Sequence, residues 1–421
     1  MLNVLRRSTY VRQIATLMTG TLMSQIIMLG SIPLLTRLYT PGEFGLYSLF
    51  VSIITILGKV SSLKYEQAIM LPKNPKDAEA LLFLSLFITM ALVVVCSMVV
   101  LVFHPFLMAY FDNNAVYVYL IPIGMFLLGT VQIFNAFSSR QQEYKMMTKV
   151  RVYNAFNAAA IQLSTRYFAN MNGLVFGRLA ADAFSLVYFA THIFRKNTLQ
   201  LKRISRRRVI FNVYKHHHFP KFQSLTVFLN AVSQNVPVLL LGYFYSAEIA
   251  GYYALTARAL QAPVGLVGSA TREVFYQKAS KLYAEGESFY KLYFQTTLNL
   301  LKIFLIPLAV VFFFGEELFG IVFGAHWTES GAYAEILIFW VLFLFINSPS
   351  IMSFSILSLQ KVQMYVEILS LVVRAGSISL GFYMFDSIVL SITFFMFASV
   401  MVNIFVISYI FAKLRKRHQC V

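Results

Sequence analysis

Six basic residues of this chain fall inside or beside otherwise apolar stretches, and they are the strongest candidates for chemistry. Arg374 lies 13 residues beyond Lys361, which in a helix places it roughly 20 Å further along and close to the centre of a bilayer. An arginine that faces hydrocarbon there costs at least about 3 kcal/mol, so we expect Arg374 to face a cavity or a partner such as Glu367. A fixed cation in a cavity suits an anionic ligand.

Arg258 and Lys302 are the next candidates for lining a cavity. Arg258 follows Gly251 by seven residues, about 10 Å along a helix. Lys302 lies nine residues from Tyr293, so its long side chain could also reach the membrane surface. For Arg37 and Arg178 a structural role is favoured, and Arg166, near a periplasmic end, is interpreted as interfacial.

Arg178 and Asp182 are four residues apart, which puts them on one face of a helix. The simpler interpretation is an internal ion pair, although such a pair could also exchange a proton. We therefore take Asp182, Arg178 and Glu367 as candidates for ion coupling.

Uncharged polar side chains also recur at helical spacing in two apolar stretches. The two sets are Thr21, Ser24 and Gln25, and Thr226, Asn230, Ser233 and Gln234. They could line a cavity or form polar contacts between helices. The candidate substrate-binding residues are therefore Arg258, Arg374, Lys302, Asn230, Gln234 and Gln25.

Membrane-spanning helices are the elements that would position these residues. The chain has 421 residues, of which 58% are hydrophobic and 12% charged, about half the charged share of a soluble protein. Twelve apolar windows are long enough to cross about 30 Å of hydrocarbon as helices. They are Gln13–Leu35, Phe44–Leu63, Ala78–Phe103, Ala115–Phe137, Val152–Phe168, Leu174–Phe194, Phe222–Tyr245, Ile249–Thr271, Phe294–Phe314, Ala332–Ile356, Met364–Phe385 and Ile388–Ala412. The fifth is the weakest because it carries several polar residues.

The basic residues are concentrated on alternate connections between these windows. The formal net charge is +18, and 29 of the 35 lysines and arginines fall at or near the side that holds both termini. The positive-inside rule makes that side cytoplasmic. The same distribution argues against nucleic acid as the partner, because the charge is spread between apolar stretches rather than gathered on one face.

A basic strip, Arg195–Lys221, separates the first six windows from the last six. It holds nine lysines and arginines and the run His216–His218. We interpret it as a cytoplasmic linker between an N-terminal lobe, residues 1–194, and a C-terminal lobe, residues 222–421. Orientation and contact with anionic lipid explain its charge, and three consecutive histidines do not converge on one metal ion.

The two lobes also resemble each other in sequence. Ser24-Gln25 is matched by Ser233-Gln234, and the stretch from Gly45 by the stretch from Gly251, at offsets of 209 and 206 residues. Two lobes of six helices with the same topology would be related by an axis along the membrane normal.

The sequence PLLTRLYTPGEFGLY from Pro33, followed by KYEQAI from Lys64, resembles the Wzx-type lipid-linked oligosaccharide flippases. So do HFPKF from His218 and the later residues Asn230, Pro237, Gly251, Arg258 and Pro263. The MATE drug exporters belong to the same superfamily. The resemblance implies an all-α integral membrane protein with twelve transmembrane helices in two six-helix lobes around a central cavity that opens alternately to each side.

The same resemblance implies the substrate, a sugar repeat unit on undecaprenyl diphosphate that moves to the periplasmic leaflet of the bacterial inner membrane. It implies membrane lipid, a polysaccharide polymerase and the chain-length machinery as partners. Neither a cofactor, a metal nor catalytic residues are expected.

Two other functions stay open. A MATE-like exporter of cationic drugs would need an acidic cavity, whereas the unpaired charges expected here are mostly basic. A polysaccharide polymerase or ligase would need a sizeable periplasmic loop, and the longest outer connection, residues 315–331, is short.

Overall fold

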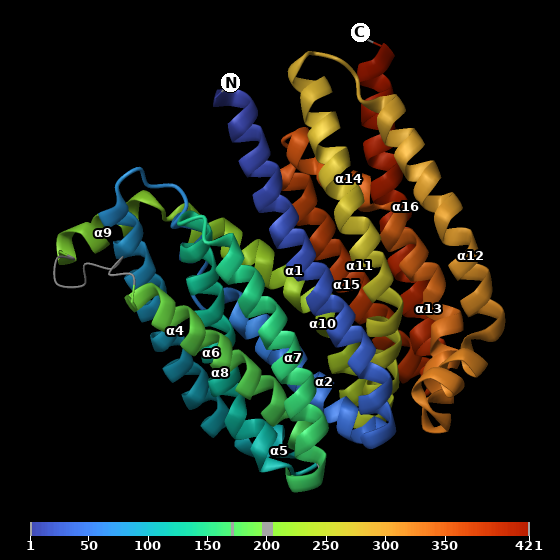
Figure 1. The fold of residues 1–421 in the computed structure, drawn as a ribbon. Helices are drawn as coiled ribbons and strands as arrows, with labels where there is room; N and C mark the ends of the chain where they lie inside the picture. The colour runs from blue at the N-terminus through green and yellow to red at the C-terminus, as the bar shows by residue number, and fades with distance from the viewer. Residues whose placement is uncertain (1, 170–171, 196–204, 420–421) are drawn as a thin grey trace. The chain divides into compact units, whose positions relative to one another are not determined.

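The computed structural model describes residues 2–169, 172–195 and 205–419, and all regular structure in these ranges is helical (Figure 1). Ten of the described helical segments are long and apolar enough to cross a membrane. The predicted all-α membrane fold is therefore confirmed. The fifth and eighth windows fall outside these ten because α7 (Tyr144–Ala169) and α11 (Ala247–Ala284) are more polar, yet both form long helices.

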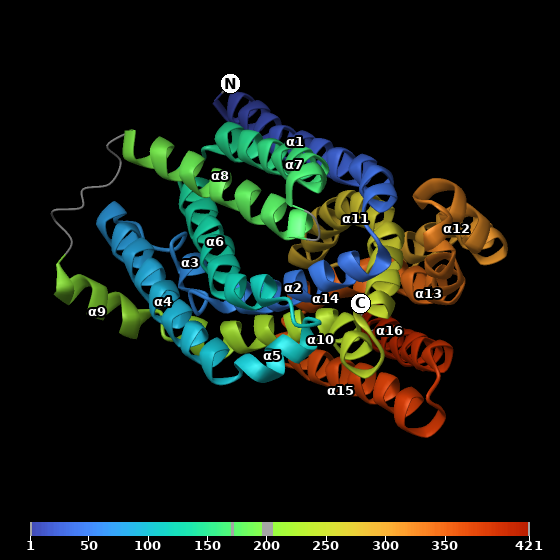
Figure 2. The same ribbon diagram turned by 90° about the horizontal axis from the view of Figure 1, so that it is seen from below.

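The chain divides into two compact units, Met1–Ala231 and Val232–Val421. In the first unit, α7 packs against α1 and α8, while α6 packs against α2, α4 and α8 (Figure 2). Its elements are α1 (Leu2–Leu38), α2 (Pro41–Val60), α3 (Tyr65–Ala68), α4 (Pro75–Val102), α5 (His104–Tyr110), α6 (Ala115–Arg140), α7, α8 (Gly173–Arg195), α9 (Arg206–Lys215) and the π-helix η3 (Phe219–Gln223).

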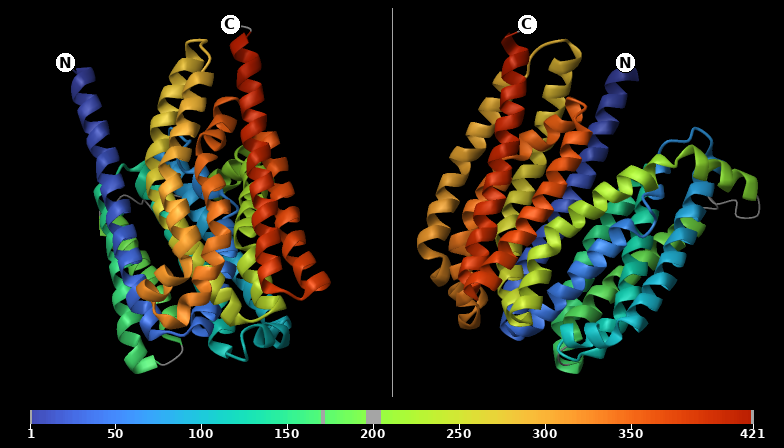
Figure 3. Two further views of the ribbon diagram at one scale, coloured as in Figure 1. Left: turned by 90° about the vertical axis from the view of Figure 1, so that its right-hand side faces the viewer. Right: turned by 180° about the vertical axis from the view of Figure 1, so that it is seen from behind.

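In the second unit, α13 contacts α11, α12 and α16, and α15 lies alongside α16 (Figure 3). The boundary between the units falls inside α10 (Ser224–Phe244). The remaining elements are α11, α12 (Tyr290–Phe323), the 3₁₀ turn η4 (Ala325–Trp327), α13 (Thr328–Ile346), α14 (Ser348–Ile356), α15 (Gln360–Phe385) and α16 (Ile388–Gln419).

Local sequence sets where several of these helices begin. Thr40 and Glu43 form a reciprocal capping box at the start of α2, with Pro41 in its first turn. Asn74 caps α4 and Asn114 caps α6, each accepting a hydrogen bond from a backbone N–H two residues on. These caps satisfy N–H groups that have no partner within their own helix.

The tenth window is not one continuous helix. It was predicted over Ala332–Ile356, but the structure interrupts it at Asn347, between α13 and α14. Pro349, in the first turn of α14, has no N–H to continue the preceding helix. The side-chain amide nitrogen of Asn347, Nδ2, donates to Asn403 Oδ1 on α16 at 2.7 Å.

Part of the basic strip forms a helix that docks on the first unit. Residues 196–204 of the strip lie outside the described residues, and α9 follows them. Val209 and Val213 of α9 pack against the apolar cluster around α4, and Arg208 Nε lies 3.5 Å from Asp77 Oδ1. Burial and the adjacent Lys215 lower the pKa of His216, just after this helix. The ring is therefore neutral at pH 7.

Candidate functional site

Arg374 on α15 is the most deeply buried arginine candidate from the sequence. Only 5% of the residue is exposed. Its Nη1 donates to the Ser233 hydroxyl of α10 at 3.2 Å and approaches the Ser233 carbonyl oxygen at 3.4 Å. Its Nε is buried without a hydrogen-bond acceptor among the described residues. Ser233 therefore anchors a guanidinium that still has a donor to offer.

No carboxylate neutralises Arg374 within ion-pair distance in the described part of the chain. Glu367, the predicted acidic partner, lies seven residues earlier on the same helix and forms no ion pair with Arg374. A buried donor without an acceptor costs about 1–3 kcal/mol, and more when it is charged. The site therefore suits an anionic oxygen that would satisfy the guanidinium.

The other candidates of the second unit do not join Arg374. Arg258 of α11 is half-buried, whereas Lys302 of α12 and Gln234 of α10 are exposed. Among the described residues, none of the three forms a hydrogen bond or ion pair with Arg374. Ser233 is buried against Arg374, whereas Gln234, the next residue, is exposed. Asn230, half-buried, begins this set one turn earlier on α10.

In the first unit, the predicted pair on α8 is present. Arg178 Nε lies 2.8 Å from Asp182 Oδ2. The other carboxylate oxygen of Asp182 accepts from the Asn154 amide of α7 at 3.0 Å, and the same amide nitrogen reaches the Ser185 hydroxyl at 2.9 Å. Asn154 is one of the polar residues that weaken the fifth predicted window, and nothing in the sequence indicates that it faces Asp182. Arg178 and Asp182 thus belong to a buried contact between two helices.

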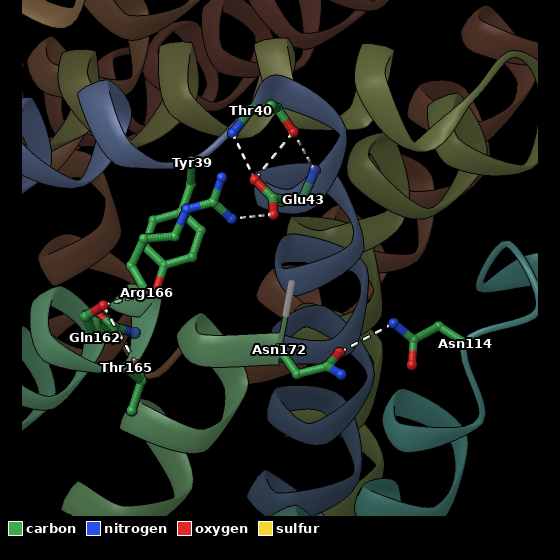
Figure 4. Close-up of polar contacts among 8 residues, drawn as sticks. All are labelled: Tyr39, Thr40, Glu43, Asn114, Gln162, Thr165, Arg166 and Asn172. Atoms are coloured by element: carbon green, nitrogen blue, oxygen red, sulfur yellow. Dashed lines mark hydrogen bonds and ion pairs between the residues drawn. The ribbon is translucent and has the colours of Figure 1, made fainter. Parts of the chain in front are cut away.

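A second network secures the turn between α1 and α2, as Figure 4 shows. Arg166 Nη1 of α7 lies 2.7 Å from Glu43 Oε1, and its guanidinium lies over the Tyr39 ring at 5.3 Å. The Tyr39 hydroxyl donates to the Gln162 carbonyl oxygen at 2.7 Å. Burial raises the pKa of Tyr39, so this hydroxyl keeps its proton. The charge of Arg166 therefore stabilises the turn between α1 and α2 through the ion pair with Glu43.

The polar face of α1 has a partner that sequence reasoning missed. Arg151 precedes the fifth predicted window, Val152–Phe168, and would thus lie on a cytoplasmic connection, but α7 already begins at Tyr144 and includes it. Arg151 Nη1 donates to the Thr21 hydroxyl at 2.8 Å. Nearby in sequence on α1, Gln25 is half-buried, and its Oε1 is buried without a hydrogen-bond donor among the described residues. Neither the start of α7 nor its contact with α1 is visible in the apolar pattern.

Known structures with this arrangement of helices define the class of fold. An inward-facing multidrug resistance MATE family transporter of the MOP superfamily matches 94% of this chain and 96% of its own, with a TM-score of 0.76 and 12% sequence identity. A MOP superfamily transporter from Pyrococcus furiosus, described as having a binding pocket of reverse polarity, matches 97% and 95%, with a TM-score of 0.64 and 12% identity. The fold is therefore that of the MOP superfamily transporters.

The sequence defines the family within that fold. Residues 34–332 match the family described as polysaccharide biosynthesis protein, and the chain belongs to it. No curated protein matches the chain in sequence. The chain is thus a multi-pass membrane protein of polysaccharide biosynthesis with a transporter fold.

Proposed function

We propose that the protein is a flippase that moves lipid-linked oligosaccharide repeat units across the bacterial inner membrane by alternating access. The observation that carries this proposal is membership of a polysaccharide biosynthesis family on a transporter fold. A diphosphate with a sugar head cannot cross hydrocarbon unaided, because its charges and hydroxyl groups would lose their hydration. A surface polysaccharide whose units are built on a lipid inside the cell needs such a transporter.

The charges of the described residues support an anionic substrate. Two buried carboxylates of the first unit, Glu43 and Asp182, are each neutralised by an arginine. In the second unit, Arg374 and Arg258 have no carboxylate within 4 Å among the described residues. A transporter of cationic drugs would need the opposite balance. We assign the diphosphate to Arg374 and Arg258, and we keep the Arg178–Asp182 pair as the site proposed for ion coupling.

The proposed orientation puts both termini and the basic strip in the cytoplasm. Its support is the concentration of lysines and arginines on that side of the predicted spans. In this orientation the lipid-linked unit enters from the leaflet where it is made and leaves toward the periplasm.

Deletion of the gene tests the function. The deletion strain should accumulate lipid-linked repeat units on the cytoplasmic leaflet and lose a surface polysaccharide, and the wild-type gene should restore it. Normal surface polysaccharide in a deletion strain that contains no second flippase would refute the proposal.

Arg374 provides the first test at residue level. Arg374→Ala should reduce export of the polysaccharide at least roughly tenfold, because it removes charge-assisted hydrogen bonds worth about 1.5–3 kcal/mol. Arg374→Lys keeps the charge and should retain part of the export. Surface polysaccharide is measured against the amount of folded protein in the membrane. Lys281→Ala, at an exposed position, is the matched control.

Ser233→Ala separates binding from a purely structural role of Arg374. It removes the hydroxyl anchor but keeps the charge, so export should fall less than in Arg374→Ala. Full export by a normally folded Arg374→Ala protein would remove this arginine from the substrate path.

A further inference from the structure

A groove runs along the second unit between α11 and α12. Both helices pack against α13, and they contact each other over only a short part of their length, so α13 forms the floor and α11 and α12 form the walls. Pro263 on α11 and Pro307 on α12 both line the groove. A proline inside a helix removes one backbone hydrogen bond and bends the helix, which favours the separation of these two walls.

One part of the groove is an apolar chamber of about 270 Å³. Ile338 and Phe345 of α13 lie at its floor and are buried. Val267 of α11 and Ile303 of α12 are its outer residues, and they are 45% and 57% exposed. The chamber is therefore open along one side and lined by aliphatic and aromatic carbon.

The neighbouring part is a chamber of about 460 Å³ in which five polar residues stand beside Val274, Phe275 and Leu292, and we call it the polar chamber. Lys278 of α11 and the amides of Gln295 and Asn299 of α12 line it and are exposed. In the part of the chain that the structure describes, none of these three side chains forms a hydrogen bond or ion pair. Each therefore has donors available, and Lys278 adds a positive charge.

The two chambers follow one another along the same two helix faces. Thr271 comes four residues after Val267 on α11, and Asn299 comes four residues before Ile303 on α12. Four residues are one helical turn, about 6 Å. Polar side chains thus join both walls from the same place onward, which gives the groove an apolar end and a more polar, cationic end.

The length of α11 places this change near the edge of the hydrocarbon. The helix begins at Ala247 and has 38 residues, about 57 Å, nearly twice the thickness of about 30 Å that it must cross. About 20 residues suffice for the crossing, which reaches Val267. Residues from Thr271 to Lys278 then lie at the level of the lipid headgroups.

We propose that this groove, the α11–α12 groove, binds the carrier lipid of the substrate. As the substrate enters, the first part of the isoprenoid chain lies in the apolar chamber, and the adjoining phosphate lies beside Lys278, with Gln295 and Asn299 donating to phosphate or sugar oxygens. The phosphate passes from there to Arg374 and Arg258 during transport. The inference rests on the proposed function and specifies where the lipid part of the substrate is held. The polar chamber is the larger of the two. It therefore suits a polyprenyl lipid, which carries a bulky head on one chain, better than a phospholipid, which carries a compact headgroup on two chains.

Binding of a polyprenyl phosphate to the purified full-length protein tests the apolar chamber. Ile303→Trp would place a large ring at the open side of that chamber. It should weaken binding roughly tenfold or more, measured by native mass spectrometry, because the chain would lose much of its apolar contact. Ile306→Trp, at a position 74% exposed that does not line the chamber, is the matched control and should bind like the wild type. Equal binding by both variants would overturn the proposal.

Lys278 tests the polar chamber without a change in packing. Lys278→Ala should remove most of the preference for polyprenyl phosphate over the uncharged polyprenol, while Lys281→Ala should keep that preference. An unchanged preference in Lys278→Ala would overturn the assignment of the phosphate. Displacement of polyprenyl phosphate by equimolar phosphatidylglycerol would also overturn it, because the groove would then bind membrane lipid in general.

Export in cells separates this inference from the proposed function. If the wild-type gene restores polysaccharide to the deletion strain and Ile303→Trp restores it equally with unchanged lipid binding, the groove assignment fails and the flippase stands. If the wild-type gene has no effect on any surface polysaccharide, the flippase itself fails, and the carrier-lipid assignment fails with it.

Discussion

Arginines inside the helices of this protein differ in how their charge is compensated. Arg166 and Arg178 each lie against a carboxylate, whereas Arg374 has a hydroxyl, a carbonyl oxygen and an unsatisfied Nε. A compensated arginine holds helices together, and an uncompensated one in a dry environment favours an anion. This difference is the reason for assigning the substrate phosphate to Arg374.

The Arg178–Asp182 pair should be a stabilising contact. Asp182→Ala removes the partner of a guanidinium that is only 26% exposed and should destabilise the folded protein by about 1–3 kcal/mol. The melting temperature of the purified protein should fall accordingly. Arg178→Leu combined with Asp182→Ala should recover part of the loss, because no unpaired charge is left. Glu285→Ala, at an exposed ion pair, is the control. An unchanged melting temperature in Asp182→Ala would show that neither the ion pair nor the contact of Asp182 with Asn154 of α7 stabilises the fold.

The sequence predicted which charged residues lie within apolar windows, but not which of them have a partner on another helix. Spacing within one helix was enough to predict the contact between Arg178 and Asp182. The contacts of Arg374 with Ser233, of Arg166 with Glu43 and of Arg151 with Thr21 join different helices. Such contacts depend on how helices pack, which no local spacing encodes.

At the scale of elements, glycines set the closest approach of α7 and α8. A Cβ atom on Gly177 would lie 2.4 Å from Gln162 Cγ and 2.8 Å from the Gln162 backbone nitrogen. Small residues let helices in membranes approach this closely. The buried polar contacts of Asn154 and Gln162 lie along the same interface.

Gly177→Ala should therefore push the two helices apart. We expect a loss of about 1–3 kcal/mol, as for overpacking of a tight interface, seen as a lower melting temperature. Gly30→Ala is the matched control on α1, because a Cβ there meets nothing within 4 Å, and a helical alanine is favoured over glycine. Equal melting temperatures for the two variants would contradict this account of the interface.

Apolar windows predicted most helices of the fold but not all of their limits. Hydropathy measures how favourably a segment transfers into lipid, not whether it forms a helix. The polar residues of α7 therefore weaken its apolar window, although α7 is a 26-residue helix that starts at Tyr144. The interruption at Asn347 is hidden in the same way, because both α13 and α14 are apolar. Conversely, α9 lies in a charged strip that no apolar window covers. Val209 and Val213 pack it against the apolar cluster around α4.

At the scale of the whole molecule, the two units share a sequence pattern that has diverged in use. Ser233 anchors the buried Arg374, whereas its counterpart Ser24 donates to the Thr21 carbonyl oxygen of its own helix. Arg374 and the α11–α12 groove belong to the second unit, while the Arg166–Glu43 and Arg178–Asp182 pairs belong to the first. We therefore expect the second unit to supply most of the binding energy for the substrate head and its carrier.

Transport in proteoliposomes tests the central claim most directly. The purified protein would be reconstituted with a fluorescent lipid-linked oligosaccharide, and the fraction of head groups protected from an added impermeant quencher would be followed in time. Wild-type protein should exchange the head groups between leaflets. Arg374→Ala should do so at least roughly tenfold more slowly, because the variant loses a charge-assisted hydrogen bond to the substrate. Head groups that stay in their leaflet as they do in protein-free liposomes, with the protein folded and inserted, would contradict the account.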